Sequence, residues 1–184
     1  MGDGKRIFFL GLGPIGGAIA RRLAAAGHEV IVYDRSDDRA DAWVASDDSG
    51  AIRVPTPASG AEGADGVIAC LDRDEDIEAM FLDEDGALAA MRKDAVLIDH
   101  TAGPIRIVRL LAQDGSAHGV HLVDAPVACG RAEDENGTLA IACDCSEEAL
   151  ALARPIMDAY AARIIHAGAA GSGQAAAMAN QERV

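Results

Sequence analysis

The chain has 184 residues, 50% of them hydrophobic and 25% charged, which excludes a disordered or low-complexity chain and predicts a folded core. Aromatic residues make up only 3%, so aliphatic side chains and alanine must fill that core. Thirty acidic against 16 basic residues give a formal net charge of −14, which argues against nucleic acid or an anionic membrane as a partner.

No segment of the sequence indicates export or a membrane. No apolar run approaches the roughly 18 residues of a membrane span, and no charged-then-apolar leader precedes a cleavage site. Cys143 and Cys145 lie two residues apart without a second pair at metal-site spacing, which argues against zinc. We therefore expect a cytoplasmic protein with reduced thiols and no bound metal.

Short apolar runs alternate with helical patterns along the chain. The expected strands are Ile7–Leu10, Glu29–Tyr33, Ala51–Val54, Gly66–Cys70, Ala95–Asp99, His121–Asp124, Thr138–Cys143 and Arg163–His166. The expected helices are Pro14–Ala26, Asp37–Ala45, Asp74–Phe81, Pro104–Ala112, Ser146 to about Tyr160, and Gln174–Arg183. Pro55–Gly63 reads as a loop or a broken turn. Continuous apolar strands separated by amphipathic helices predict one α/β domain, a doubly wound parallel sheet of the Rossmann class covered on both faces.

A glycine-rich turn of the form G-x-G-x-x-G lies between the first strand and the first helix. It consists of Gly11, Leu12, Gly13, Pro14, Ile15 and Gly16. Gly11 permits the tight turn, Gly13 lets the backbone approach a pyrophosphate, and Gly16 allows close helix–strand packing. The helix N-terminus adds N–H groups and partial positive charge for that anion. The alternative is a turn that is merely rich in glycine, but the strand and helix around the motif favour dinucleotide binding.

The end of the second strand bears on the choice between NAD and NADP. Asp34 follows Gly16 by 18 residues, near the spacing expected of an acid that binds the adenosine ribose and repels a 2′-phosphate. Arg35 and Ser36 argue the other way, because a guanidinium and a hydroxyl suit a 2′-phosphate. The balance leans slightly toward NAD and leaves NADP open.

The segment GLGPIGGAIARRLAAAGHEVIVYDRS resembles the opening of the β-hydroxyacid dehydrogenases, the family of 3-hydroxyisobutyrate dehydrogenase, tartronate semialdehyde reductase and 6-phosphogluconate dehydrogenase. The resemblance continues through nearly the whole chain. Val123–Gly130 resembles the family's V-D-A-P-V-S-G-G, and Gly137–Leu139 matches the G-T-L that follows it. Several separate motifs in the family's order make this resemblance specific.

Two further motifs of the family imply contacts with the nicotinamide half of a dinucleotide. The segment DGVIACLD is similar to a family strand that ends in Leu-Pro and touches the cofactor with its backbone, with Leu71 matching and Asp72 replacing the proline. The resemblance thus implies cofactor contacts by Cys70, Leu71 and Asp72. The segment DHTAGP resembles the family's D-H-T-T-A-x-P, one residue shorter, and implies that Thr101 lies near nicotinamide and substrate.

The chain departs from the family where the family carries out its proton transfer. The segment GSGQAAAMANQ resembles the family's G-x-G-Q-A-A-K-x-x-N-N, and Ala177 stands at the position of the catalytic lysine. Asn180 matches the first asparagine of the closing pair, whereas Gln181 replaces the second. Ala128 and Cys129 replace a Ser-Gly pair that holds the substrate carboxylate. An alanine cannot relay a proton as the lysine does.

The resemblance also implies a domain division and a function. Residues 1–167 would form the NAD(P)-binding domain and residues 168–184 the start of the interdomain helix, after which the family continues into an all-α domain that builds a dimer. It implies an oxidoreductase that binds a dinucleotide and a small hydroxy acid, with Thr101 and Asn180 as catalytic residues. A truncated member and a stand-alone binding domain both stay open. So do a dinucleotide-binding module without turnover and a reductase of altered chemistry, like the imine reductases.

One histidine is a further candidate for proton transfer. Asp99 and His100 lie at the end of a predicted strand and face the expected cleft. His100 could act as an acid–base group. The alternative, which we prefer, is a loop histidine whose ring is fully hydrogen-bonded.

Overall fold

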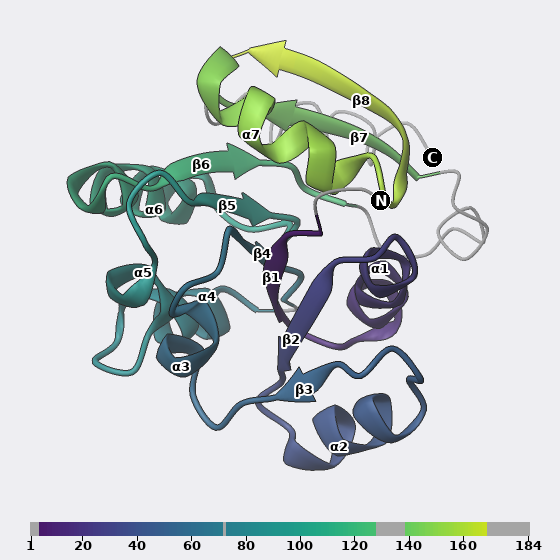
Figure 1. Ribbon diagram of the computed structural model, residues 1–184. Coiled ribbons are helices and arrows are strands. Elements are labelled where there is room, and N and C mark those ends of the chain that lie inside the picture. Colours follow the sequence, from purple (N-terminus) through teal and green to yellow (C-terminus); the bar gives the residue numbers. More distant parts are fainter. Residues whose placement is uncertain (1–3, 72, 128–138, 169–184) are drawn as a thin grey trace, which may run out of the picture.

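One sheet of eight strands runs through the described part of the chain (Figure 1). The computed structural model describes residues 4–71, 73–127 and 139–168. The strands are β1 (Arg6–Leu10), β2 (Glu29–Tyr33), β3 (Ile52–Arg53), β4 (Gly66–Ala69), β5 (Val96–Asp99), β6 (His121–Asp124), β7 (Leu139–Asp144) and β8 (Ala161–Gly168). The helices are α1 (Pro14–Ala25), α2 (Asp37–Ala45), α3 (Pro57–Ala61), α4 (Asp74–Leu82), α5 (Ala87–Ala90), α6 (Ile105–His118) and α7 (Glu147–Met157).

The order of the strands determines where the carboxyl ends of β1, β2 and β4 lie in the sheet. The sheet runs β3-β2-β1-β4-β5-β6-β7-β8, and its first six strands are parallel, so the order reverses direction between β1 and β4. In register, Leu10 of β1 pairs with Tyr33 of β2 on one side and with Ala69 of β4 on the other. The residues that follow these three strands therefore meet at one edge, where such sheets bind their ligands.

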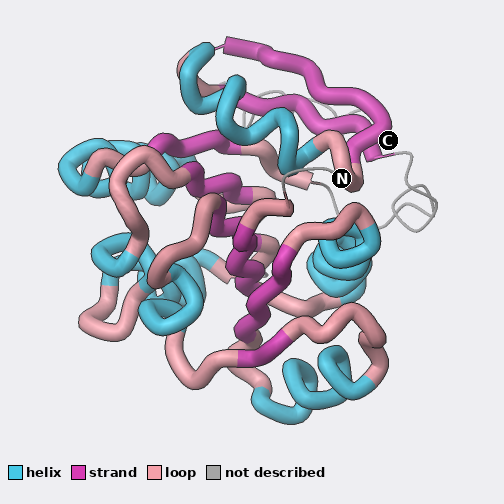
Figure 2. The backbone as a smooth tube through the Cα atoms, viewed as in Figure 1, coloured by secondary structure: helices cyan, strands magenta, loops and turns pink. Residues whose placement is uncertain are grey.

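Helices cover both faces of the sheet, as Figure 2 shows with helices on either side of the strands. In β1 the side chains of Ile7 and Phe9 pack on the face covered by α1, α2 and α7, whereas Phe8 and Leu10 pack on the face covered by α3 to α6. This alternation follows from the two-residue period of a strand. No helix within the described ranges is both long enough and apolar enough to cross a bilayer.

The sheet is mostly parallel, which confirms the expected fold class, and the pairing of β7 with β6 is the one antiparallel departure among the described strands. β7 runs antiparallel to β6, with Asp124 paired to Asp144, and β8 then runs parallel to β7. An antiparallel neighbour starts near the end of the preceding strand, whereas a parallel one needs a crossover back to the other end of the sheet. The apolar pattern of a strand is the same in both cases, so it carried no information on direction. The expected helix at Gln174–Arg183 lies outside the described residues.

Several helical segments also differ from the expectation: α5 was not expected, and α7 ends at Met157, before the expected Tyr160. The stretch expected as a loop contains α3, which begins with a capping box in which the Thr56 side chain accepts the Ser59 N–H and the Ser59 hydroxyl accepts the Thr56 N–H. α6 continues past Ala112, the expected end, to His118. Gly119 then adopts the left-handed conformation, with φ of 74°, that ends many helices.

Candidate functional site

The turn between β1 and α1 combines two crowded glycines with one that faces open space. A Cβ atom on Gly11, whose φ is +92°, would lie 2.3 Å from the Cys70 carbonyl oxygen. A Cβ on Gly16 would lie 2.1 Å from the carbonyl oxygen of Gly11. A Cβ on Gly13, by contrast, would meet no atom of the described chain within 4 Å. Packing within the protein therefore requires glycine at positions 11 and 16, whereas the space beside Gly13 is open.

Helix α1 begins beside that space without a side-chain cap. Gly13 is the N-cap and provides no side-chain cap, Pro14 follows it, and the first turn holds no acidic residue. The first N–H groups of a helix lack partners within the helix, and its N-terminus carries partial positive charge. This end of α1 therefore suits a phosphate group.

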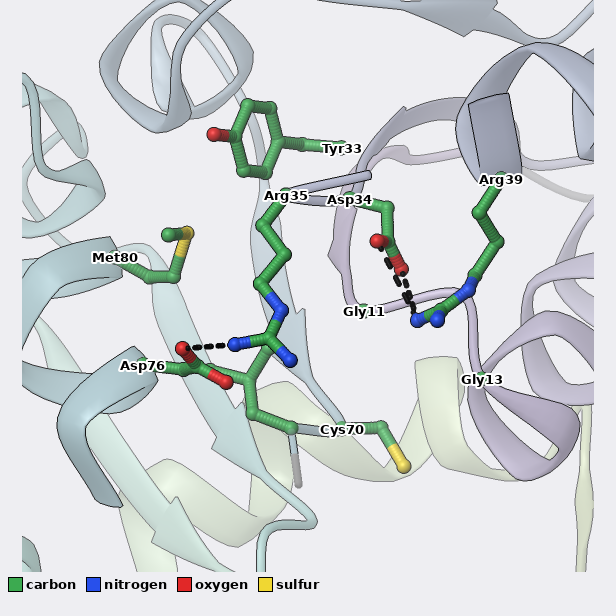
Figure 3. A pocket seen from close by; sticks show the side chains of 10 residues that line it. Gly11, Gly13, Tyr33, Asp34, Arg35, Arg39, Cys70, Asp76 and Met80 are labelled. Carbon is green, nitrogen blue, oxygen red and sulfur yellow. Dashed lines mark hydrogen bonds and ion pairs between the residues drawn. The ribbon is translucent and has the colours of Figure 1, made fainter. Parts of the chain in front are cut away.

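A pocket opens beside this turn, between the end of β2 and helix α4 (Figure 3). Its lining consists of Gly11, Gly13, Tyr33, Asp34, Arg35, Arg39, Cys70, Leu71, Asp76 and Met80. The glycine turn, the strand-end acid and the end of β4 thus come together as the sequence predicted, although they are far apart in the chain.

Asp34 connects the glycine turn to the start of α2. Its Oδ2 accepts the Leu12 N–H at 2.8 Å and its Oδ1 accepts the Ser36 N–H at 2.9 Å. The Arg39 guanidinium lies 3.2 Å from Oδ2, and the Asp34 side chain is only 3% exposed. Asp34 therefore has a structural part in shaping the turn, beside the ribose contact that the sequence predicts.

Arg39 was missed by the sequence analysis. It lies at the third position of α2, whose N-cap Ser36 accepts the Arg39 N–H with its side chain. The spacing from Asp34 was the available signal, because one turn of helix returns the side chain to the end of the preceding strand. A second guanidinium thus borders the pocket next to Asp34.

Arg35 extends from the end of β2 across the pocket to α4, as Figure 3 shows. Its Nη1 donates to Oδ1 of Asp76 at 2.9 Å. Arg73 donates two hydrogen bonds to the same carboxylate, from Nε to Oδ2 at 3.3 Å and from Nη2 to Oδ1 at 3.1 Å. Burial alone would raise the pKa of Asp76, but the guanidinium groups of Arg73 and Arg35 outweigh it and hold that pKa below its ordinary value.

Thr101 lies behind the pocket wall, at 2% exposure. Its hydroxyl oxygen accepts the Leu71 N–H at 3.1 Å, and its own N–H donates to Oδ1 of Asp99 at 2.9 Å. Burial raises the pKa of Asp99 to about 6, although hydrogen bonds from Thr101 act in the opposite direction. Thr101 thus fixes the backbone of Leu71, and its contact with nicotinamide or substrate stays a prediction.

His100 is a hydrogen-bonded loop histidine, the alternative that the sequence analysis preferred. The ring is buried, with Nδ1 2.7 Å from the Ala125 carbonyl oxygen and Nε2 2.9 Å from the Tyr160 hydroxyl. A neutral ring that donates from Nδ1 and accepts at Nε2 satisfies both contacts. Burial lowers the pKa of His100 to about 4, so the ring stays uncharged near neutral pH.

Several predicted residues lie outside the described part of the chain. They are Asp72, Ala128, Cys129, Ala177, Asn180 and Gln181. Their roles therefore stay predictions. Within the described ranges, no group of three or more His, Cys, Asp or Glu side chains could hold a metal ion.

The chain resembles dehydrogenases over nearly its full length. The family model described as the NAD binding domain of 6-phosphogluconate dehydrogenase matches residues 6–168. The NAD-dependent L-serine dehydrogenase of Pseudomonas aeruginosa is 33% identical over 178 residues, which make up 97% of this chain and 59% of that protein. The solved structure of Mycobacterium tuberculosis 3-hydroxyisobutyrate dehydrogenase with L-serine matches with a TM-score of 0.87 and 33% identity, over 96% of this chain and 59% of that chain. Psf3, solved with NADP⁺ and 2-OPP, matches with a TM-score of 0.86 and 25% identity, over 95% and 61% of the two chains.

The strand order, the glycine turn and the open N-terminus of α1 define an NAD(P)-binding domain of the Rossmann class. The chain belongs to the family of the NAD-binding domain of 6-phosphogluconate dehydrogenase, with relatives named 3-hydroxyisobutyrate dehydrogenase. The resemblance found in the sequence is confirmed, as is NAD or NADP as the class of cofactor. The chain spans about three-fifths of the length of the relatives it matches.

Proposed function

We propose that the chain is the cofactor-binding part of an oxidoreductase that acts on a small hydroxy acid. The observation that carries the cofactor assignment is the open space over Gly13 at the uncapped N-terminus of α1. A pyrophosphate fits there because the N–H groups of the helix can bind it and no side chain fills the space. The hydroxy acid is inferred from the 3-hydroxyisobutyrate dehydrogenases among the relatives.

The residues of the pocket divide into those for the phosphates and those for the adenosine ribose. The turn from Gly11 to Gly16 would hold the pyrophosphate, and Asp34, with Arg35 and Ser36, would lie against the ribose. The ribose hydroxyls would bind the carboxylate of Asp34, whose Oδ1 faces the connection between β2 and α2 and whose Oδ2 faces the glycine turn.

The end of β4 would hold the nicotinamide half. The backbone of Cys70, Leu71 and Asp72 would lie along the second ribose, and the hydrogen bond from Leu71 to Thr101 would keep that backbone in place. When bound, the dinucleotide supplies the hydride acceptor or donor of the reaction. Thr101 and Asn180 would orient the substrate.

We propose NAD as the preferred dinucleotide. The two guanidinium groups that could bind a 2′-phosphate are each paired with a carboxylate, Arg35 with Asp76 and Arg39 with Asp34. A 2′-phosphate would have to displace one of these ion pairs and would also lie near the negative charge of Asp34. A ribose with a free 2′-hydroxyl faces neither obstacle.

A dinucleotide-binding module without turnover is the second candidate, because Ala177 occupies the position of the family's catalytic lysine. Both candidate functions predict that the chain binds a dinucleotide, but only the first predicts turnover of a hydroxy acid. Titration of the chain with NADH and with NADPH, followed by the fluorescence of the reduced nicotinamide, tests binding. A parallel screen of hydroxy acids for reduction of NAD and NADP tests turnover. We expect saturable binding of NADH, and its absence would overturn the proposed function.

A further inference from the structure

The pocket contains an ion pair that crosses it from one side to the other. Arg35 follows β2, Asp76 lies in the first turn of α4, and their side chains meet at 2.9 Å (Figure 3). The Asp76 side chain is 13% exposed, so solvent screens this pair less than a fully exposed one. Both residues line the pocket.

Arg73 keeps Asp76 aimed at the pocket independently of Arg35. Its guanidinium contacts both carboxylate oxygens of Asp76 from three residues earlier in the chain. Asp76 would therefore stay charged and in place when Arg35 moves away. For Arg35, leaving Asp76 means losing a charge-assisted hydrogen bond, which is stronger than one between neutral groups.

The carboxylates of Asp34 and Asp76 would affect the binding of a dinucleotide in different ways. A ribose with free hydroxyls and a ribose with a 2′-phosphate both bring sugar oxygens to Asp34, so Asp34 affects both cofactors directly. Asp76 lies on the opposite wall, on α4, and reaches the ribose end of the pocket through Arg35. The guanidinium of Arg35 is the group that a 2′-phosphate would recruit.

We propose that Asp76 is a specificity-determining residue of this site, because its carboxylate competes with the 2′-phosphate of NADP for Arg35. Asp76 thereby weakens the binding of NADP and leaves that of NAD nearly unchanged. The inference rests on the proposed function, in which this pocket holds the adenosine half of a dinucleotide. Under this inference, the preference between NAD and NADP depends on α4 as well as on the segment that follows β2.

The test is the affinity of the chain with Asp76→Asn for NADPH and for NADH, measured by fluorescence titration. We expect the Kd for NADPH to fall about three- to tenfold, the range expected from the loss of one partly buried competing ion pair. The Kd for NADH should change by less than about twofold, because a free 2′-hydroxyl does not recruit a guanidinium. Asp76→Ala should act in the same way, and thermal melts of both variants check that they fold.

Glu78→Gln provides a matched control. Glu78 lies on the same helix, loses the same charge in the variant, and pairs with Arg106 at 2.8 Å instead of with a pocket residue. If Glu78→Gln lowers the Kd for NADPH as much as Asp76→Asn does, general charge and not competition is responsible. That result would overturn the inference.

The Arg35→Ala background separates competition from direct repulsion. Without Arg35 there is no guanidinium to compete for, so Asp76→Asn should no longer tighten NADPH binding. An equal gain with and without Arg35 would contradict the proposal. If NADH and NADPH both bind but their ratio is the same in wild type and Asp76→Asn, the inference fails and the proposed function stands. If the wild-type chain binds neither cofactor, the proposed function fails, and the inference with it.

Discussion

The Leu71 backbone N–H donates to the Thr101 hydroxyl oxygen at 3.1 Å and so ties the segment after β4 to the segment after β5. The two strands are neighbours, with Ala69 in register with Asp99, and the hydrogen bond continues their connection two residues beyond each strand. The wall of the pocket at Leu71 is therefore fixed by a side chain that does not line the pocket itself. This arrangement leads to the first of five predictions.

Replacing Thr101 by valine should loosen this wall. Valine keeps the shape of threonine but leaves the Leu71 N–H without its acceptor, which we expect to lower the free energy of unfolding by about 1–3 kcal/mol. NADH binding should weaken as the backbone of Leu71 shifts. Thr101→Ser retains the hydroxyl and serves as the control. Urea unfolding and fluorescence titration measure both effects, and equal results for the two variants would contradict this account.

Gly13→Val should abolish dinucleotide binding with little effect on stability. The backbone of Gly13, with φ of −60° and ψ of −178°, is accessible to valine, and its Cβ meets no atom of the described chain. The new side chain would instead occupy the place of the pyrophosphate. We expect a loss of less than about 1 kcal/mol in the free energy of unfolding, typical of a change at an N-cap.

Gly16→Ala provides the contrast to Gly13→Val, since its Cβ would meet the Gly11 carbonyl oxygen and destabilise the fold. Calorimetry with NADH measures binding, and thermal melts measure stability. Unchanged affinity in Gly13→Val would show that the glycine turn does not hold the pyrophosphate.

Asp99 and His100 should make opposite contributions to the pH dependence of stability. The pKa of Asp99 is raised from 3.8 to about 6 by burial, so its contribution falls as pH rises through that range. The pKa of His100 is lowered from 6.5 to about 4, so its contribution is lost as pH falls through that range. Asp99 and His100 each change the free energy of unfolding by about 3 kcal/mol over their range of pH. The two changes have opposite signs and nearly cancel between pH 4 and 6.

Single substitutions of Asp99 and His100 should separate their two contributions to the pH dependence of stability. Relative to wild type, His100→Gln should gain stability as pH falls from 6.5 toward 4. Asp99→Asn should gain stability relative to wild type as pH rises from 4 toward 6. Urea unfolding across this pH range gives both slopes. Parallel stability curves for wild type and both variants would mean that neither group changes its pKa on folding.

Asp34→Asn should shift the cofactor preference toward NADP. The variant removes the charge that repels a 2′-phosphate. Its single side-chain oxygen can accept only one of the Leu12 and Ser36 N–H groups, which bind different oxygens of Asp34. It also releases Arg39 from an ion pair. We expect the ratio of NADPH to NADH affinity to rise about tenfold, whereas Arg35→Ala should lower it. Fluorescence titrations measure the ratios, and unaltered ratios in both variants would mean that neither residue contacts the ribose end.

The chain should bind a dinucleotide but oxidise common 3-hydroxy acids very slowly. Ala177 cannot relay a proton, and general acid–base catalysis typically contributes about a hundred- to ten-thousandfold in rate. Ala177→Lys alone should not restore the rate, because the resemblance predicts that Ala128 and Cys129 stand where the family positions the substrate carboxylate. Formation of NADH from 3-hydroxyisobutyrate measures the rate. Robust turnover by the unmodified chain would refute this prediction.

The sequence by itself determined the alternation of strands and helices and the place of the glycine turn. β2 and α2 have the expected bounds, and Gly27, with φ of +91°, lies just after α1. These features depend on interactions within a few residues: the period of the apolar side chains, the capping groups, and backbone conformations that glycine adopts readily. Interactions over so few residues can be predicted from the sequence.

Only the tertiary structure decided which polar groups meet. Arg35 and Asp76 are 41 residues apart, and His100 and Tyr160 are 60 residues apart. Their contacts depend on the order of the strands and on which ends of the strands share an edge, and local periodicity specifies neither. The antiparallel direction of β7 and the burial of Thr101 and His100 follow from the same cause, because apolar patterns indicate that a segment is buried but not what it is buried against.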